Sequence, residues 1–190
     1  MITGPSGVGK GTLIRTLLER VPELELAVSA TTRRPRLGET HGVDYYFLDD
    51  AEFDRRVAAN EFVEHAGYSG RRYGTLRSEL DQRLARGKSV VLEIEVQGAR
   101  QVRETMPEAV RIFIAPPSEE ALRTRLIGRG TDSPDDVTKR LATAAAELGA
   151  QDEFSHVVVN DRLEVAVAAL EEVVRSALGS EVMHRTEEPS

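Results

Sequence analysis

The chain has 190 residues, a length that suits one domain. Its 25 Lys and Arg against 32 Asp and Glu give a net charge of −7, which disfavours nucleic acid and anionic membranes as partners. The sequence contains no Cys, which excludes disulfides, thiolate metal sites and cysteine nucleophiles and fits the reducing cytoplasm where we expect the protein to act. Its four His are scattered, which argues against a histidine-rich metal site. No apolar run approaches the ~20 residues of a membrane span.

Apolar patterning alternates between strands and helices along most of the chain. Three apolar segments predict buried strands, at residues 89–96, 109–115 and 156–160. Helical patterns predict helices at residues 10–20, 50–60, 75–86 and 163–178, and two more that begin at Ser118 and Ser133. Because strands that alternate with helices form parallel sheets through right-handed crossovers, the sequence predicts an α/β fold.

Residues 30–75 interrupt this alternation. They are rich in Arg, Tyr and Gly, and they predict short strands and turns around the one helix near residues 50–60. We interpret this segment as an insert on the sheet. At the other end of the sequence, the polar residues 180–190 predict a frayed tail.

A glycine-rich segment, Gly4-Pro-Ser-Gly-Val-Gly-Lys-Gly-Thr12, lies between the first predicted strand and the first predicted helix. Its spacing is that of a phosphate loop, in which glycines let successive backbone N–H groups turn toward a phosphate. The N-terminus of the following helix adds partial positive charge, and Lys10 adds a full charge that can follow a transferring group. The segment therefore predicts a phosphate-binding site.

The loop departs from its usual form in two ways. Gly11 follows the lysine, where a Ser or Thr hydroxyl normally binds Mg²⁺. Either Thr12 supplies that hydroxyl, or the metal is held by phosphates, water and an acidic residue. In addition, only Met1-Ile-Thr3 precede the loop, whereas a strand usually has about five or six residues. We therefore expect the first strand to be incomplete.

An ordered series of motifs follows the phosphate loop. It comprises Ser29-Ala-Thr-Thr-Arg-Arg-Pro-Arg36, Gly38-Glu39, Gly42-Val-Asp-Tyr-Tyr-Phe47, Glu61-Phe-Val-Glu64, Gly70-Arg-Arg-Tyr-Gly-Thr75, Leu92-Glu-Ile-Glu-Val-Gln-Gly98, Gly128-Arg-Gly-Thr-Asp132, Lys139-Arg-Leu141 and Val158-Val-Asn-Asp161. Together these motifs resemble the guanylate kinase family, enzymes that convert GMP and ATP to GDP and ADP. The resemblance extends to about residue 178.

The resemblance implies a parallel sheet with a phosphate loop, flanked by helices, with an inserted nucleotide-monophosphate-binding subdomain and a helical lid. One domain would span residues 1–178, and residues 179–190 would form a flexible tail. Within that domain, the core would comprise residues 1–29, 81–117 and 146–178, the GMP-binding insert about 30–80, and the lid about 118–145. The sequence leaves the oligomeric state open.

A cluster of arginines within an acidic protein predicts a site for the acceptor phosphate. Guanidinium groups bind phosphate oxygens in a bidentate way, and tyrosine hydroxyls can add neutral donors. By resemblance, Arg33, Arg36, Tyr45 and Tyr73 hold the phosphate of GMP. Arg34 lies between the matching positions and is not assigned.

Guanine presents N1–H and an exocyclic amine side by side, so one carboxylate can accept both hydrogen bonds. Adenine offers an acceptor at N1, and a site of this kind can reject such an analogue by roughly 10⁴–10⁵-fold. By resemblance, Glu64 is that carboxylate, Ser29 and Thr75 contact the base, and Glu95 lies close to it or to water-bridged Mg²⁺. Because Glu93 is two residues from Glu95, we expect both on one face of a strand. Glu93 then either shares that site or pairs with an arginine.

The remaining assignments concern the donor nucleotide and also follow from the resemblance. ATP would be bound by Gly4, Pro5, Ser6, Gly7, Val8, Gly9, Lys10, Gly11, Thr12, Arg129 and Asn160. The catalytic set would be Lys10, Arg36, Arg129 and Arg140, with Mg²⁺ as the metal, held by Thr12 or otherwise by phosphates and water. Glycines on both sides of Arg129 are typical of a segment that closes over a ligand.

Two other functions are compatible with a phosphate loop. One is an inactive domain that binds proteins, although this chain retains the loop lysine, the lid arginines and the acceptor cluster. The other is a related kinase for a sugar phosphate or another nucleotide, which would lack the Glu64 and tyrosine pattern. The interpretation that retains all motifs is a kinase with ATP and GMP or dGMP as substrates.

Overall fold

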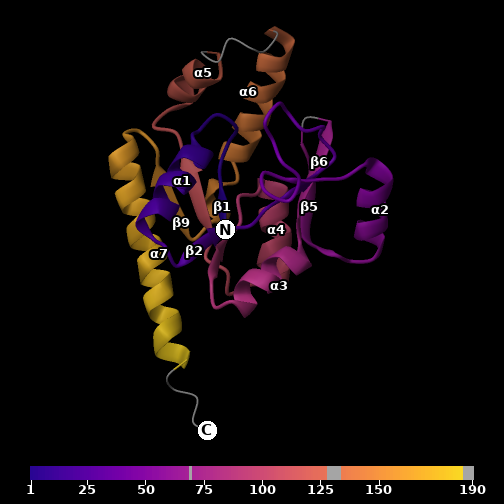
Figure 1. Cartoon of the computed structure of the whole chain (residues 1–190). Helices are drawn as coiled ribbons and strands as arrows, with labels where there is room; N and C mark the ends of the chain where they lie inside the picture. Colours follow the sequence, from indigo (N-terminus) through magenta and orange to yellow (C-terminus); the bar gives the residue numbers. More distant parts are fainter. Residues whose placement is uncertain (69, 128–133, 186–190) are drawn as a thin grey trace. The chain divides into compact units, whose positions relative to one another are not determined.

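The computed structural model describes residues 1–68, 70–127 and 134–185 (Figure 1). Within residues 134–139 and 180–185 the description covers the backbone alone. The chain divides into two compact units. The first, the acceptor unit, comprises Glu23–Ala109 together with Met1, and the second, the loop unit, comprises Ile2–Pro22 and the chain from Val110 onward.

The loop unit is built around a parallel sheet with the strand order β1-β8-β9. Its strands are β1 (Ile2–Thr3), β8 (Ile112–Ala115) and β9 (His156–Val159), and its helices are α1 (Lys10–Arg20), α5 (Glu119–Ile127), α6 (Pro134–Leu148) and α7 (Leu163–Arg185), with a short 3₁₀ helix at Gln151–Glu153. All four residues of β8 are buried, as a central parallel strand requires. Helix α1 packs against α7 and buries Leu13, Ile14 and Leu17.

The acceptor unit contains two sheets. A parallel pair joins β2 (Leu24–Leu26) to β7 (Ser89–Val91), and a mixed sheet has the order β4-β3-β6-β5. The mixed sheet consists of β4 (Tyr46–Phe47), β3 (Ala30–Thr31), β6 (Arg71–Leu76) and β5 (Phe62–Tyr68), and the helices are α2 (Asp50–Ala58), α3 (Arg77–Ala85) and α4 (Val96–Thr105). The short strands and single helix predicted for residues 30–75 are present. Helix α4 packs against the edge strand β5.

Several predicted boundaries are wrong. The strand predicted at residues 89–96 ends at Val91, and the sequence analysis missed α4, which begins at Val96 with Glu95 as its N-cap residue. Glu93 and Glu95 therefore do not share a strand. The segment 75–86 is helical only from Arg77, because Thr75 belongs to β6.

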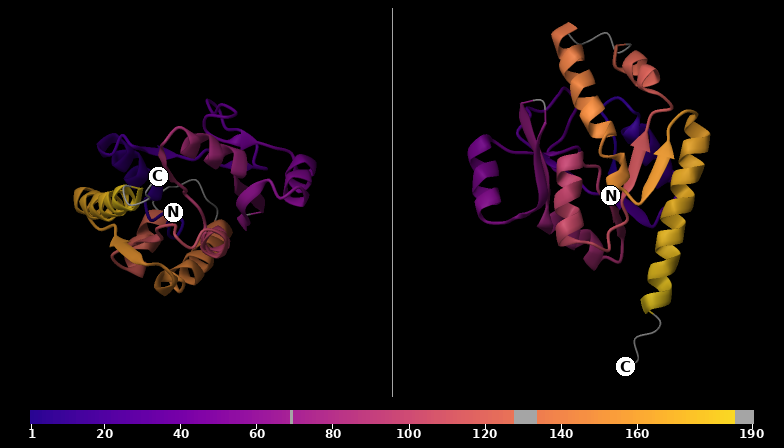
Figure 2. Two further views of the ribbon diagram at one scale, coloured as in Figure 1. Left: turned by 90° about the horizontal axis from the view of Figure 1, so that it is seen from below. Right: turned by 180° about the vertical axis from the view of Figure 1, so that it is seen from behind.

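Two further differences concern the end of the chain. Strand β9 is an edge strand and not a buried one, since Val157 and Val159 are exposed on it. Helix α7 continues past the predicted end at residue 178 to Arg185, so the backbone of residues 179–185 is helical (Figure 2). The helix predicted at residues 10–20 has the bounds that the sequence gives. No helix within the described ranges is both long and apolar enough to cross a membrane.

Phe53 joins α2 to the mixed sheet, and we expect its removal to destabilise the acceptor unit. Its ring is fully buried, stacks on Phe62 with centroids 4.5 Å apart, and lies 4.2 Å below the Arg72 guanidinium carbon. Phe53→Ala should lower the free energy of unfolding by about 3–5 kcal/mol in chemical denaturation. Leu37→Ala, at a fully exposed side chain, is the control and should change it by less than about 0.5 kcal/mol. Equal losses in the two variants would contradict this assignment.

Candidate active site

The phosphate loop lies between β1 and α1, as the sequence predicts, and its backbone depends on glycine. Gly4 and Gly9 have φ angles of +152° and +100°, which L side chains rarely adopt. A Cβ atom at Gly4 would overlap the carbonyl oxygen of Ile114 on β8, and one at Gly9 would lie 2.7 Å from the Asn160 amide nitrogen. Conformation and packing thus both exclude side chains from these two positions.

Two side chains of the loop unit, those of Lys10 and Asn160, donate hydrogen bonds to backbone carbonyls of the phosphate loop. The Lys10 ammonium donates to the Gly4 carbonyl at 2.5 Å and approaches that of Pro5 at 3.4 Å. The buried amide of Asn160, which follows β9, donates to the Val8 carbonyl at 2.8 Å. Asn160 therefore contacts the loop itself in this structure, and its predicted place beside ATP stays a prediction.

Helix α6 approaches the loop at Ser6. The Arg140 guanidinium donates to the Ser6 hydroxyl at 3.0 Å, so the structure brings this predicted residue to the phosphate loop. The backbone N–H of Ser6 donates to the Glu147 carboxylate at 3.3 Å. Sequence reasoning missed Glu147, although its spacing of two helical turns from Arg140 puts both on one face of α6. Arg129, the other predicted lid residue, lies outside the described residues.

In the acceptor unit, contacts link three of the residues predicted for the GMP phosphate, namely Arg33, Tyr45 and Tyr73. Arg33 forms a bidentate ion pair with Glu39, with both N–O distances 2.8 Å, and its guanidinium carbon lies 5.1 Å from the centre of the Tyr45 ring. The rings of Tyr45 and Tyr73 meet edge to face at 6.3 Å. Burial raises the pKa of Tyr45, and so does the nearby negative charge of Glu93. Tyr45 therefore presents a neutral hydroxyl at physiological pH.

Glu39 is a second residue that sequence reasoning did not assign. Its carboxylate also accepts the backbone N–H of Arg36 at 2.6 Å. The hydrogen bonds from Arg33, followed by the one from Arg36, lower the pKa of Glu39 to about 2. The Arg36 side chain is exposed and makes no hydrogen bond within the described part of the chain. Arg36 thus has its backbone fixed while its guanidinium stays available to a ligand.

Glu64 is a buried carboxyl group on β5, and it is 4% exposed. The hydroxyl of Thr75, its partner on β6, donates to its carboxylate at 2.8 Å, so the structure joins two residues predicted to contact guanine. Burial raises the pKa of Glu64 to about 7, the charge of Glu95 adds to that rise, and the bonds from Thr75 oppose it. Such a carboxyl group is poised to accept hydrogen bonds from a ligand that supplies donors.

Glu95 and Ser29 are the two remaining residues of the predicted base site. One carboxylate oxygen of Glu95 is buried and has no hydrogen-bond partner among the described residues, as a group that awaits a ligand would be. The Ser29 carbonyl accepts the N–H of Tyr46 at 2.9 Å, which fixes the backbone at this position next to β3. No contact of the Ser29 hydroxyl tests its predicted role.

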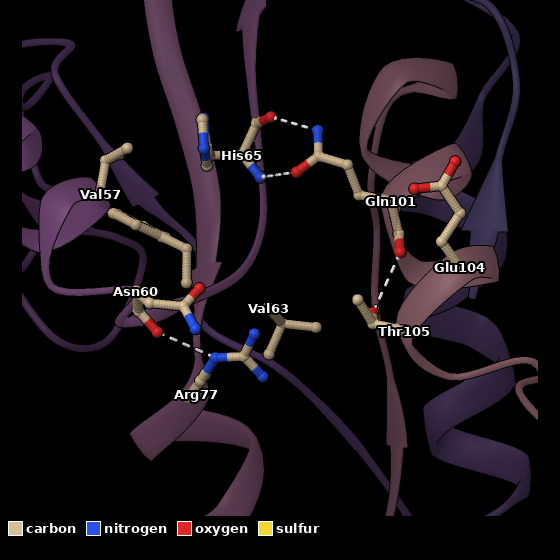
Figure 3. A pocket seen from close by; sticks show the side chains of 9 residues that line it. Val57, Asn60, Val63, His65, Arg77, Gln101, Glu104 and Thr105 are labelled. Carbon is tan, nitrogen blue, oxygen red and sulfur yellow. Dashed lines mark hydrogen bonds between the residues drawn. The ribbon is translucent and has the colours of Figure 1, made fainter.

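A small cavity of about 180 Å³ lies elsewhere in the acceptor unit (Figure 3). It is lined by Val57, Asn60, Phe62, Val63, His65, Arg77, Gln101, Glu104 and Thr105, none of which belongs to the predicted site. Glu64 is not among the lining residues, and it pairs in regular register next to His65 on β5, so the side chains of Glu64 and His65 point to opposite faces. We therefore assign the candidate site to the Glu64 side of β5 and not to this cavity.

A phosphate loop ahead of a parallel sheet, with an insert that carries acidic and basic ligand groups, defines the class of P-loop nucleotide kinases. The family model for guanylate kinase matches residues 1–177. The guanylate kinase of Thermobifida fusca is 56% identical over 160 residues, 84% of this chain and 82% of its own, and that of Thermosynechococcus vestitus is 53% identical over 176 residues, 93% and 92%.

Solved structures agree with the sequence matches. A crystal structure of guanylate kinase from Anaplasma phagocytophilum has a TM-score of 0.75 at 36% identity and covers 92% of this chain and 82% of its own. The chain belongs to the guanylate kinase family, whose members phosphorylate GMP with ATP. The family and fold predicted from the sequence are confirmed, whereas the individual site residues stay predictions.

The raised pKa of Glu64 predicts a pH-dependent stability. The unfolded chain releases this proton near the ordinary glutamate pKa of 4.5 and the folded protein only near a pKa of about 7, so the stability of the folded state falls as pH rises between these values. Glu64→Gln removes this penalty and keeps an acceptor for Thr75. It should stabilise the ligand-free protein at pH 8, on the order of 2–3 kcal/mol, with little gain at pH 4.5.

Thermal and chemical unfolding at both pH values measure this effect. Glu61→Gln, at a surface carboxylate that pairs with Arg55 and Arg56, is the control for loss of one charge. A gain for Glu64→Gln that is equal at the two pH values would show that burial of the charge is not its cause.

Proposed function

We propose that this chain transfers the γ-phosphate of ATP to GMP, and to dGMP, through the residues described above. One observation carries the assignment to guanine: the acceptor unit holds a buried carboxyl group, Glu64, and within the described residues the Thr75 hydroxyl donates to one of its two oxygens. Guanine offers two adjacent donors to such a group. Adenine offers none at N1, which would leave the buried carboxylate without its partners.

The acceptor phosphate would bind at Arg33 and Arg36, with the hydroxyls of Tyr45 and Tyr73 as further donors. The exposed guanidinium of Arg36 supports this assignment, and so does the position of Arg33 against the Tyr45 ring. Arg33 already pairs with Glu39, so a phosphate would join or replace that carboxylate on the guanidinium. Because dGMP carries the same base and phosphate, the same residues would bind it.

ATP would bind with its phosphates along the loop from Gly4 to Thr12. Mg²⁺ prefers oxygen ligands, and the Thr12 hydroxyl on the exposed first turn of α1 fits that requirement. No group of three or more acidic or histidine side chains within the described ranges could hold the ion alone, so nucleotide phosphates and water would complete its shell. When bound, Mg²⁺ would neutralise charge on the β- and γ-phosphates.

The chemistry would depend on position and charge, since the acceptor phosphate is an anion near neutral pH and needs no general base. Lys10 would leave the Gly4 carbonyl for the transferring group, and Arg140 would turn from Ser6 to the phosphates. Arg129 is proposed from the resemblance alone. Closure of the lid would exclude water, which would otherwise hydrolyse ATP.

ADP release in a coupled assay tests this function directly. With ATP present, GMP and dGMP should give turnover, whereas AMP and UMP should give at most about 1% of it. Lys10→Ala should lower kcat by at least about 10²-fold, the effect of one lost electrostatic donor. GMP binding without turnover would instead indicate a binding module, and a preference for another acceptor would indicate a different kinase.

Gly11→Ser tests how Mg²⁺ is held. A side chain at Gly11 meets no other atom within 4 Å, so serine fits without displacing the loop. If the missing hydroxyl limits Mg²⁺ binding, the variant should reach half of its maximal rate at about 3–10-fold lower Mg²⁺ concentration. This is the change in affinity expected when one added oxygen ligand contributes about 1 kcal/mol of binding free energy. Gly11→Ala is the control and should not change this requirement. An unchanged Mg²⁺ requirement in Gly11→Ser would show that the hydroxyl is dispensable.

A further inference from the structure

Gly98, in the first turn of α4, is buried directly against the carboxylate of Glu64. A Cβ atom built at Gly98 would overlap a carboxylate oxygen of Glu64, and it would lie 3.0 Å from the carboxyl carbon and 3.4 Å from Cγ. All three of its nearest neighbours belong to that one side chain. The backbone conformation at position 98 does not require glycine, because the residue lies in a regular helix and its φ is not positive.

We propose that Gly98 is a base-specificity determinant of this kinase: the absence of a side chain there makes the space in which the Glu64 carboxylate lies. The inference rests on the proposed function, because it assumes that Glu64 binds guanine. Gly98 acts through Glu64 and is therefore a positioning residue. A single methyl group at this position would move the carboxylate away from the base.

Helix α4 cannot retreat from β5 to relieve such an overlap. One turn beyond Gly98, the Gln101 side-chain amide binds the backbone of His65 twice: its oxygen accepts the His65 N–H at 3.1 Å, and its nitrogen donates to the His65 carbonyl at 2.7 Å (Figure 3). Residues three apart on a helix share a face, so Gln101 fixes the spacing between α4 and β5 where Gly98 faces Glu64.

The carboxylate itself has limited room to move. Thr75 holds one oxygen at 2.8 Å, and the negative charge of Glu95 opposes a shift toward the start of α4. The atoms that a methyl group would meet are nevertheless the far end of a flexible side chain and not backbone. Gly98→Ala should therefore fold, with Glu64 displaced from its hydrogen bond with Thr75.

The test compares Gly98→Ala with the wild type on GMP, dGMP and IMP. IMP lacks the exocyclic amine and so depends less on Glu64. Gly98→Ala should raise KM for GMP and dGMP at least about 10-fold, as for the loss of a hydrogen bond to a charged group, and change KM for ATP by less than about 2-fold. The preference for GMP over IMP in kcat/KM should fall by about 10-fold. A merely structural defect would lower activity on all three acceptors together.

In a protein that already carries Glu64→Ala, the substitution Gly98→Ala should lose its effect. The double variant should differ from Glu64→Ala by less than about 2-fold in kcat/KM for GMP, because the effects of substitutions at contacting residues do not add. Gly179→Ala, at a glycine of α7 with open space around its Cα, is the matched control and should retain full activity and preference. Should Gly98→Ala alone fail to fold, the double variant with Glu64→Ala should fold again.

Three results would overturn the inference: an unchanged preference for GMP over IMP in Gly98→Ala, an equal loss of activity in the Glu64→Ala background, or a misfolded Gly98→Ala that Glu64→Ala does not rescue. Failure of the proposed function is a separate outcome. It would appear as a wild-type protein that does not phosphorylate GMP at all, whatever the behaviour of the variants.

Discussion

Burial of the Glu64 carboxyl group is the constraint on which the proposed base selection depends. A charge removed from water is costly unless hydrogen bonds replace its hydration, and here Thr75 is the side chain that supplies one. The pKa near 7 expresses this deficit, since the ligand-free protein holds the proton far more tightly than an exposed glutamate does. A ligand with two adjacent N–H donors would supply what is missing, so the same unfavourable burial that weakens the empty protein favours guanine over a base without those donors.

The groups proposed to bind phosphate differ from Glu64, because each already has a hydrogen-bond acceptor within the protein. Lys10 binds a loop carbonyl, Arg33 binds Glu39, and the Ser6 N–H binds Glu147. Each internal partner is an oxygen acceptor that resembles a phosphate oxygen in charge or geometry. Pairing of this kind holds the cations in place, and a nucleotide would compete with these oxygen acceptors and not with bulk water alone.

The sequence predicts local features well where the residues themselves dictate them. The phosphate loop and the helix from Lys10 to Arg20 follow from glycine spacing and apolar periodicity, and the structure has both. The end of β7 does not follow, because residues 89–96 are apolar enough for a longer strand and α4 begins with a valine and soon reaches a glycine, both poor helix formers. Tertiary packing against β5 overrides that preference.

The unpredicted parts of the candidate site arise from contacts that no local sequence pattern reveals. Glu147 lies far along the chain from Ser6, and no local pattern links the two residues. Glu39 belongs to a motif that the sequence analysis quoted for the family, yet its role as the partner of Arg33 depends on how the intervening loop folds back. Gly98 shows the same limit most clearly, since a helical glycine with ordinary backbone angles reveals its purpose only through the side chain that fills its space.

The residues proposed to bind the donor and the acceptor belong to different parts of the chain, and the physical demands on the two proposed sites differ. A phosphate loop binds a triphosphate through backbone N–H groups and a lysine. Its selectivity between bases is therefore low, whereas its backbone conformation is strictly constrained. The acceptor unit must instead distinguish bases, which requires buried side chains whose hydrogen bonds only one base completes. Changes in α4 and β5 would therefore alter which monophosphate is accepted while the loop's chemistry stays the same, because no residue of that pair of elements belongs to the phosphate loop.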